Sequence, residues 1–213
     1  MLPKPLFNIF KRILDIFSSI FLIILFSPIL LFTSIIIKLS SPGPIFFKQK
    51  RVTKNYQEFW MYKFRSMYTG DNDKRLQENY PELWKKYKDA GWKLPMSEDP
   101  RITPIGKIIR ATSIDEFPQL INVLKGEMSL VGPRAYREEE LQEYEKKYPK
   151  TKKYIDEIRS VKPGITGLWQ TSGRNELNFE QRAKLDSKYI RNQSTWQEIK
   201  IILKTPTSMI SRW

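Results

Sequence analysis

Two adjacent carboxylates, Asp115 and Glu116, stand near the middle of the chain between the apolar side chains of Ile114 and Phe117. The 213 residues include no histidine and no cysteine, which excludes an imidazole base, a histidine-bound zinc ion, a disulfide and a thiolate nucleophile. Any chemistry must therefore use carboxylates, lysines, hydroxyl groups or a metal ion bound through oxygen. The role of the acidic pair decides whether the chain is an enzyme or a basic membrane-attached module.

A structural role for the pair also fits the sequence. Ser113 and Glu116 match the capping box, in which a serine caps a helix and a glutamate three positions later returns the hydrogen bond. Pro118 argues against that role, because it would then lie at the fifth helical position, where its missing N–H matters. If Phe117 caps the helix instead, both carboxylates precede it and lie in the positive field of its first turn. Asp115 and Glu116 are then free for separate roles, since adjacent residues do not share one helix face.

The chain is strongly basic, with a formal net charge of +14, and this charge predicts an anionic partner. Several cations fall in segments with turn or helix-end character: Lys63, Arg65, Arg101, Lys107, Arg110 and Arg134. Exposed lysines and arginines usually form a solvated face, and that interpretation stands for most of these. A phosphorylated substrate, however, requires several guanidinium or ammonium donors around one carboxylate site. The sequence has no RNA-recognition or helix-turn-helix signature, so we expect no nucleic acid partner.

An apolar run from residue 13 to residue 39 is long enough to reach across a bilayer core. It is too long for a signal peptide, and no small-residue cleavage site follows it. Ser27-Pro28 lies almost at its centre and predicts a kink, because proline removes a helix hydrogen bond. Basic residues flank both ends, so the charge bias favours neither orientation. The run is therefore either a re-entrant helix with both ends in the cytoplasm or an ordinary kinked transmembrane helix.

The rest of the sequence predicts an α+β fold that is mostly helical. Alternating apolar and polar residues on both sides of a turn at residues 53–56 predict a β-hairpin. A short strand is predicted at residues 128–131, and another within a glycine-rich loop at residues 161–175. Helical spacing and caps predict these helices: 71–89, 102–110, 117–124, 137–148, 150–159, 179–191 and 195–204. The last two are amphipathic, and the final one packs on the core or lies at a membrane interface.

Several longer motifs follow one another along the chain. They are Lys11-Arg12-Ile13-Leu14-Asp15 (the pattern KRxxD), the Ser27-Pro28 break, SPGPIFFKQKR, KFRSM, DPRITPIGKIIRATSIDEFPQLINVLKGEMSLVGPR and KPGITGLWQTSGRN. Across nearly its whole length the chain thus resembles the bacterial sugar transferases called monotopic phosphoglycosyl transferases, which initiate cell-surface glycan synthesis. One departure is Ala135, which follows Gly132-Pro133-Arg134 where the family usually has a second proline.

The resemblance implies a reaction and a location. Residues 1–40 would form a re-entrant membrane helix broken at Ser27-Pro28, and residues 41–213 a catalytic domain on the cytoplasmic face of the bacterial inner membrane. Asp115 would attack the β-phosphate of a UDP-sugar and release UMP, leaving a covalent aspartyl-phosphosugar. Polyprenyl (undecaprenyl) phosphate would then take the sugar-1-phosphate and begin a surface polysaccharide. Larger relatives carry further transmembrane and cytosolic parts, so this chain is expected to be a stand-alone catalytic unit.

The resemblance also implies the ligands of the site. Mg²⁺ is the expected cofactor, with Glu116 and Asp115 as its ligands beside phosphate oxygens of the substrate. The residues expected to bind substrate are Lys63, Arg65, Arg110, Arg134, Gln170 and Arg174. Membrane lipids are expected partners, and a homodimer is left open.

The segment 167–170 bears on the identity of the donor sugar. The form Gly167-Leu168-Trp169-Gln170 resembles members that transfer galactose or glucose phosphate, whereas members acting on acetamido sugars tend to have a Gly-Trp-Ala-Gln form. Galactose or glucose is therefore expected, with an N-acetylhexosamine as the alternative. A non-catalytic basic module that binds anionic membranes through its charge and aromatic residues is a second, different class of function.

Overall fold

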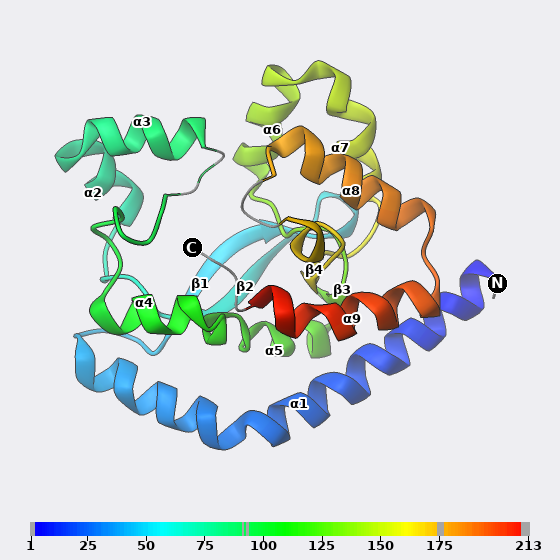
Figure 1. Cartoon of the computed structure of the whole chain (residues 1–213), viewed down its shortest axis with the longest axis horizontal. Coiled ribbons are helices and arrows are strands. Elements are labelled where there is room, and N and C mark those ends of the chain that lie inside the picture. The colour runs from blue at the N-terminus through cyan, green and yellow to red at the C-terminus, as the bar shows by residue number, and fades with distance from the viewer. Residues whose placement is uncertain (1–2, 91, 93, 174–176, 210–213) are drawn as a thin grey trace.

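The computed structural model of the chain describes residues 3–90, 92, 94–173 and 177–209. In this part of the chain helices predominate and the strands form two small sheets, in line with the predicted α+β class (Figure 1). The strands are β1 (Phe46–Val52), β2 (Glu58–Phe64), β3 (Ser129–Val131) and β4 (Gly164–Thr166). The helices are α1 (Lys4–Ser40), α2 (Asn72–Asn79), α3 (Pro81–Asp89), α4 (Pro104–Ala111), α5 (Gln119–Lys125), α6 (Glu138–Lys147), α7 (Lys152–Arg159), α8 (Phe179–Arg191) and α9 (Thr195–Met209).

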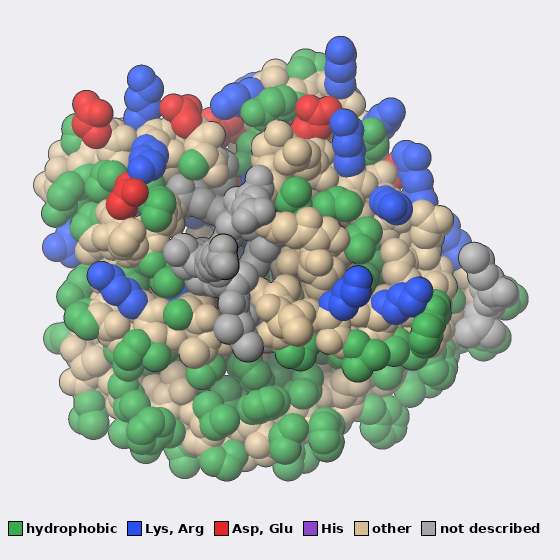
Figure 2. All heavy atoms as spheres, viewed as in Figure 1, with side chains coloured by type: hydrophobic (Ala, Val, Ile, Leu, Met, Phe, Trp, Pro, Cys, Tyr) green, Lys and Arg blue, Asp and Glu red, His purple; other side chains and the backbone are tan. Residues whose placement is uncertain are grey.

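The first helix, α1, is continuous and bends near its middle (Figure 1). Pro28 lies inside it and cannot donate the backbone hydrogen bond of its turn, so the predicted break is a bend within one helix. Among the described helices, α1 is the one long and apolar enough to cross a membrane. Most of its large apolar side chains are exposed, and they cover the lower edge of the molecule in Figure 2. Re-entry of α1 into the membrane stays a prediction.

Three polar residues near the beginning of α1 fasten it to the rest of the fold. Arg12 donates two hydrogen bonds, of 2.6 and 2.8 Å, to carbonyl oxygens in the last turn of α5. Asp15 accepts hydrogen bonds from the hydroxyl of Ser129 (2.7 Å) and from the backbone N–H of Leu130 (2.9 Å), both in β3. Lys11 forms a buried ion pair with Glu198 of α9. The KRxxD motif therefore joins the apolar helix to α5, β3 and α9.

The predicted β-hairpin is confirmed, with β1 and β2 antiparallel and a short turn between them. Side chains alternate between its two faces, because successive residues of a strand point in opposite directions. One face carries Phe59 and Met61 into the core and Lys63 toward the acidic pair. The other face carries Trp60, which is half exposed. A single strand thus supplies both core residues and a cation of the candidate site.

The strands β3 and β4 pair in parallel and bring the motifs LVGPR and KPGITG together. Their backbones approach so closely that a Cβ atom on Gly164 would lie 2.0 Å from the backbone nitrogen of Gly132. Glycine leaves room for this contact because it has no side chain. The Gly164 N–H donates to the carbonyl oxygen of Pro133 (2.8 Å), which holds the turn that precedes Arg134.

The main core lies against the hairpin and draws on distant segments. It contains Phe59 and Met61 of β2, Leu120 of α5, Val131 of β3 and Ile201 of α9. Apolar side chains of α1 pack against the same cluster. A second cluster lies among residues of α6, α7 and α8. The hairpin and the short strands are therefore supported from several sides, and this support positions the residues they carry.

Several predicted helix boundaries are wrong. The final helix, predicted at residues 195–204, continues to Met209 as α9. The predicted helix at residues 71–89 is two helices, α2 and α3, because Tyr80 leaves the helical conformation before Pro81. The helix predicted to begin at Phe117 begins at Gln119 instead, because the preceding residues form a separate 3₁₀ turn.

The predicted helix at residues 179–191 is confirmed as α8. The final helix, α9, buries Ile201 and Glu198 and leaves Trp196 and Leu203 exposed, with 64% and 72% of their surfaces accessible. This arrangement packs one face of α9 on the core. Contact of the exposed face with a membrane interface stays a prediction.

Candidate active site

The acidic pair lies in the 3₁₀ turn Ile114–Glu116 between α4 and α5. The capping-box interpretation is wrong, because Ser113 has a left-handed backbone (φ +56°) and its side chain does not cap the turn. Pro118 is instead the N-cap of α5, so both carboxylates precede that helix. Asp115 is buried, with 7% of its surface exposed, whereas Glu116 is partly exposed. The pair therefore lies in a short turn, and the N-cap position of α5 belongs to Pro118.

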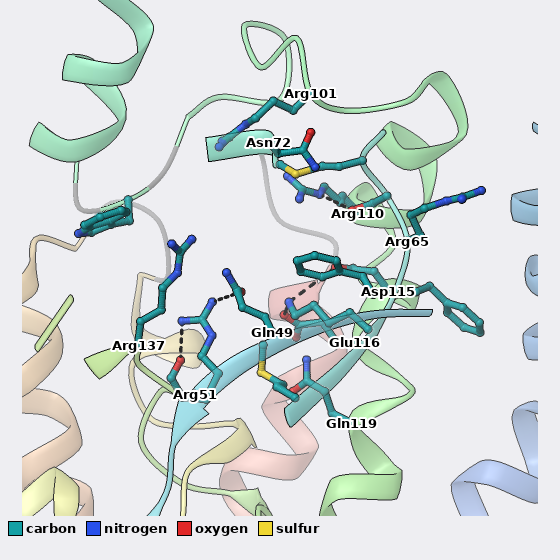
Figure 3. A pocket seen from close by; sticks show the side chains of 18 of the residues that line it. Gln49, Arg51, Arg65, Asn72, Arg101, Arg110, Asp115, Glu116, Gln119 and Arg137 are labelled. Atoms are coloured by element: carbon teal, nitrogen blue, oxygen red, sulfur yellow. Dashed lines mark hydrogen bonds and ion pairs between the residues drawn. The ribbon is translucent and has the colours of Figure 1, made fainter. Parts of the chain in front are cut away.

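A cavity of about 660 Å³ opens beside the pair (Figure 3). It is bounded by the hairpin, the segment 65–73, α4 and the loops after β3 and β4. Its lining includes seven of the predicted site residues: Lys63, Arg65, Arg110, Asp115, Glu116, Arg134 and Gln170. Arg174, which was also predicted to bind substrate, lies outside the described residues. Motifs far apart in the sequence thus meet at one cavity.

Lys63 stands beside both carboxylates. Its ammonium nitrogen lies 3.0 Å from Oε1 of Glu116 and 3.7 Å from Oδ2 of Asp115. One cation can therefore contact both acids. In the described part of the chain no three Asp, Glu, His or Cys side chains are grouped to hold a metal ion. A metal ion at the acidic pair would therefore bind two carboxylates and fill its other positions with water and substrate oxygens, which is how Mg²⁺ is usually held.

Arg110 comes from the last turn of α4, and its Nε donates to the hydroxyl of Ser66 (2.9 Å). Burial lowers the pKa of Arg110, while the negative charges of Asp115 and Asp99 raise it. Because an arginine begins from a pKa far above neutrality, the guanidinium group stays charged. Its positive charge therefore lies near the carboxylate of Asp115.

Arg65 borders the cavity but directs its guanidinium group away from the acidic pair (Figure 3). That group donates to the carbonyl oxygens of Ile37 (3.0 Å), Ser41 (2.7 Å) and Pro42 (2.7 Å) at the end of α1. A Cβ atom on Gly43 would lie 2.1 Å from one of its nitrogens, so the close approach requires glycine there. Arg65 therefore ties the end of the apolar helix to the strand that carries Lys63.

Arg134 and Gln170 are held at the cavity wall by their neighbours. The guanidinium carbon of Arg134 lies 5.5 Å from the ring centroid of Trp169, and its Nε lies 4.0 Å from Glu140. The Arg134 N–H donates to Asp186 (3.3 Å), a buried carboxyl group whose pKa burial raises to about 8. The side-chain amide of Gln170 donates to a carbonyl oxygen of β4 (2.8 Å).

The predictions missed one side of the cavity. Arg51 and Gln49 of β1 lie there with Arg137, on the side away from Asp115 (Figure 3). Arg51 donates to the side chain of Gln49 (2.6 Å) and to the carbonyl oxygen of Ala135 (3.0 Å). The alternation along β1 is the signal that identifies Arg51, because residues 47, 49 and 51 share one face of the strand. Ala135, which stands where the family usually has proline, thus anchors a cavity-lining arginine through its backbone.

Among the described residues, three arginines on this side have two carboxylates within ion-pair distance, and Arg137 lies 2.9 Å from one of them, Asp73. Arg51 and Arg134 share one nearby carboxylate, Glu140, at 3.5 and 4.0 Å. Burial lowers the pKa of Arg51 to about 9; Glu140 opposes this change, and the charges of Arg134 and Arg137 add to it. Crowded, buried guanidinium groups are stabilised by a nearby anion. The arrangement therefore suits a ligand that carries phosphate groups.

The chain is similar to known proteins over nearly all of its length. The family model of the bacterial sugar transferases matches residues 6–212. The exopolysaccharide production protein ExoY of Sinorhizobium fredii is 37% identical over 98% of this chain and 89% of its own length. The undecaprenyl-phosphate galactose phosphotransferase of Salmonella typhimurium is 38% identical over 99% of this chain. The UDP-N-acetylgalactosamine-undecaprenyl-phosphate N-acetylgalactosaminephosphotransferase of Aeromonas hydrophila is 36% identical over 99% of it. The chain spans 42% and 46% of the lengths of these two transferases.

Proposed function

The chain belongs to the bacterial sugar transferase family, and from that membership we propose that it transfers a sugar-1-phosphate from a UDP-sugar to polyprenyl phosphate and releases UMP. We propose undecaprenyl phosphate as the acceptor, because the names of two relatives contain it. The product begins a surface polysaccharide, in keeping with the name of the exopolysaccharide production relative. The observation that carries the proposal is a buried aspartate, Asp115, beside Lys63 and Arg110 in a cavity at the end of an apolar helix.

The reaction proceeds in two displacements at phosphorus. In the first, an Oδ atom of Asp115 attacks the β-phosphorus of the UDP-sugar. The new O–P bond forms as the bond from that phosphorus to the bridging oxygen breaks, and UMP leaves with the electron pair. In the second, a phosphate oxygen of the polyprenyl phosphate attacks the same phosphorus, and the Asp115 carboxylate leaves. The lipid then carries the sugar on a diphosphate.

The residues around Asp115 suit both steps. Phosphoryl transfer depends mainly on positioning and on positive charge around the transferred group. Lys63 and Arg110 supply that charge beside the nucleophile, and Arg134 supplies it from the cavity wall. Asp115 attacks as a carboxylate, so its step requires no general base. A chain without histidine can therefore carry out this chemistry.

We further propose that the reaction depends on Mg²⁺. Glu116 and Asp115 would hold it; in support, the Lys63 ammonium nitrogen lies 3.0 and 3.7 Å from the two carboxylates, so both lie within reach of a single cation. When bound, the metal ion neutralises charge on the reacting phosphate oxygens. Chelation with EDTA is therefore expected to stop turnover.

We propose that α1 re-enters the cytoplasmic side of the inner membrane, with the catalytic part in the cytoplasm. In support, α1 bends near its middle and both of its ends turn toward the rest of the fold (Figure 1). Single cysteines at the exposed positions Asn8 and Lys54 are selective probes, because the natural chain has no cysteine. A membrane-impermeant maleimide is expected to label both from the cytoplasmic side of inverted vesicles. Labelling from opposite sides would establish a crossing helix instead.

We propose galactose or glucose as the transferred sugar, with an N-acetylhexosamine as the alternative. The expected sugar rests on the form of the segment 167–170, and two residues of this segment, Trp169 and Gln170, border the cavity. The relative named for galactose and the relative named for N-acetylgalactosamine have nearly equal identities, 38% and 36%. Overall similarity therefore does not separate the two donors, and a direct assay is required.

A panel of UDP-sugars tests the function and the donor together. The purified chain in nanodiscs, with Mg²⁺ and undecaprenyl phosphate, is expected to release UMP from a UDP-hexose and much less from UDP-N-acetylhexosamines. A non-catalytic basic module would release no UMP from any donor and would bind anionic vesicles less tightly as salt increases. That second result would contradict the proposal. The mass of the same particles reports whether the chain forms the homodimer left open above.

A further inference from the structure

The lining of the cavity changes along one strand. Phe47, Gln49 and Arg51 occupy alternate positions of β1 and all line the cavity. The lining therefore changes from an aromatic ring to an amide and then to a guanidinium group. Alternate residues of a strand lie about 7 Å apart, so the backbone positions of Phe47 and Arg51 are separated by roughly 13 Å.

The aromatic end of this series lies next to the reacting groups. Phe47 is directly opposite Lys63 in the register of the hairpin. Directly opposite residues of an antiparallel pair have side chains on the same face and Cα atoms about 4.5 to 5.5 Å apart. Lys63 in turn lies 3.0 and 3.7 Å from the two carboxylates. An aromatic ring therefore flanks the position where the transferred phosphate must lie.

The same end also lies beside the apolar helix. Phe47 follows α1 after a short segment, and Arg65 fixes that segment through two carbonyl oxygens at 2.7 Å each. Pro44 and Phe46 add further apolar surface to this end of the cavity. Phe47 has 43% of its surface exposed, and covering such a ring with hydrocarbon is favourable.

We propose that Phe47 is an acceptor-recognition residue: its ring packs against the first isoprene units of the polyprenyl phosphate, while the acceptor phosphate lies at Lys63. This assignment rests on the proposed function. The donor then occupies the remaining cavity, with its nucleotide toward Arg51 and Arg137. The two substrates reach Asp115 from opposite ends, the lipid from the membrane side and the nucleotide from the side rich in arginine.

The chemistry of the two substrates supports this direction. A UDP-sugar has no hydrocarbon chain to cover a phenyl ring, whereas the acceptor is a phosphate ester of an apolar chain. A sugar ring stacked on Phe47 is the competing occupant. The two occupants differ in the half-reaction they affect, because the donor reacts before the acceptor is needed.

The two half-reactions are measured separately. Without acceptor, the wild-type chain is expected to release one UMP per active site as Asp115 is modified. Phe47→Ala is expected to raise the KM for undecaprenyl phosphate by about tenfold, while the acceptor-free release keeps its rate and amplitude. Phe47→Leu restores an apolar side chain and is expected to recover most of the loss. Trp60→Ala removes a half-exposed aromatic side chain from the opposite face of the hairpin and is expected to change neither half-reaction.

A short acceptor distinguishes direct contact from an effect on the membrane. Geranyl phosphate is a phosphate ester of only two isoprene units, and Phe47→Ala is expected to impair its use to the same degree. A loss seen only with the long acceptor, an unchanged acceptor KM, or a slowed acceptor-free release would each overturn the assignment. A wild-type chain that releases no UMP would overturn the proposed function itself, so the two failures are distinguishable.

Discussion

Replacing Asp115 with asparagine is expected to reduce UMP release by about 1,000-fold or more, because an amide cannot form the bond to phosphorus. The substitution preserves the size of the side chain and removes the charge and the nucleophilic oxygen. Intact-protein mass spectrometry of the wild-type chain, incubated with donor alone, is expected to show the added mass of one sugar phosphate. The Asp115→Asn chain is expected to show none.

Asp156→Asn is the matched control, because it makes the same chemical change at an exposed position of α7. It is expected to leave UMP release and the covalent adduct unchanged. Glu116→Gln keeps the nucleophile and removes the proposed metal ligand. It is therefore expected to lower turnover and to raise the Mg²⁺ concentration required, while still forming the adduct. Near-normal turnover by Asp115→Asn would rule out Asp115 as the nucleophile.

Replacing Lys11 with methionine is expected to lower the free energy of unfolding by about 3 to 5 kcal/mol, because it leaves a buried carboxylate without its cation. That carboxylate, Glu198, has 2% of its surface exposed and also accepts a hydrogen bond from Tyr189. For a chain of this length, such a loss lowers the melting temperature by roughly 10 °C. Thermal unfolding in detergent, followed by tryptophan fluorescence, measures it.

The cost of losing Lys11 is expected to increase with pH. Burial raises the pKa of Glu198, and the charge and hydrogen bond of Lys11 oppose that rise. The unfolded chain releases the Glu198 proton at its ordinary pKa of 4.5. Without Lys11, the folded chain holds this proton to a higher pH, so the free energy of unfolding falls as the pH rises above 4.5. Lys11→Met combined with Glu198→Gln removes both charges and is expected to recover more than half of the loss. A double variant as unstable as Lys11→Met would show that the ion pair is not the cause.

Features set by neighbouring residues were predictable from the sequence. The hairpin followed from alternation around a turn, which depends on a few consecutive residues. Thr103 caps α4, since its Oγ1 accepts the N–H of Gly106 (3.0 Å), and Gly126 ends α5 with a left-handed backbone; a threonine before a proline and a glycine after a helix are local signals of such ends. The acidic pair was identifiable as a site for the same reason, because Pro118 already argued locally against a cap.

Features set by distant residues were not predictable in this way. Arg51 contacts a carbonyl oxygen 84 residues away in the sequence, and Asp15 contacts a backbone N–H 115 residues away. A motif gives the type of a residue but not its partner. Arg65 shows the difference, since its guanidinium group holds the end of α1, a contact that its motif did not predict. Only the folded chain distinguishes the two uses of an arginine.

The docking of α1 determines how a water-soluble form of this protein has to be engineered. A chain that began after α1 would leave the carboxylate of Glu198 without Lys11 and the N–H of Leu130 without Asp15. It would also expose the apolar core surface that α1 now covers. Trimming would therefore damage the scaffold of the site along with the anchor. Redesign is better directed at the outward surface of α1, where Phe17, Ile24 and Leu31 face away from the protein and polar residues can replace them without disturbing the fold.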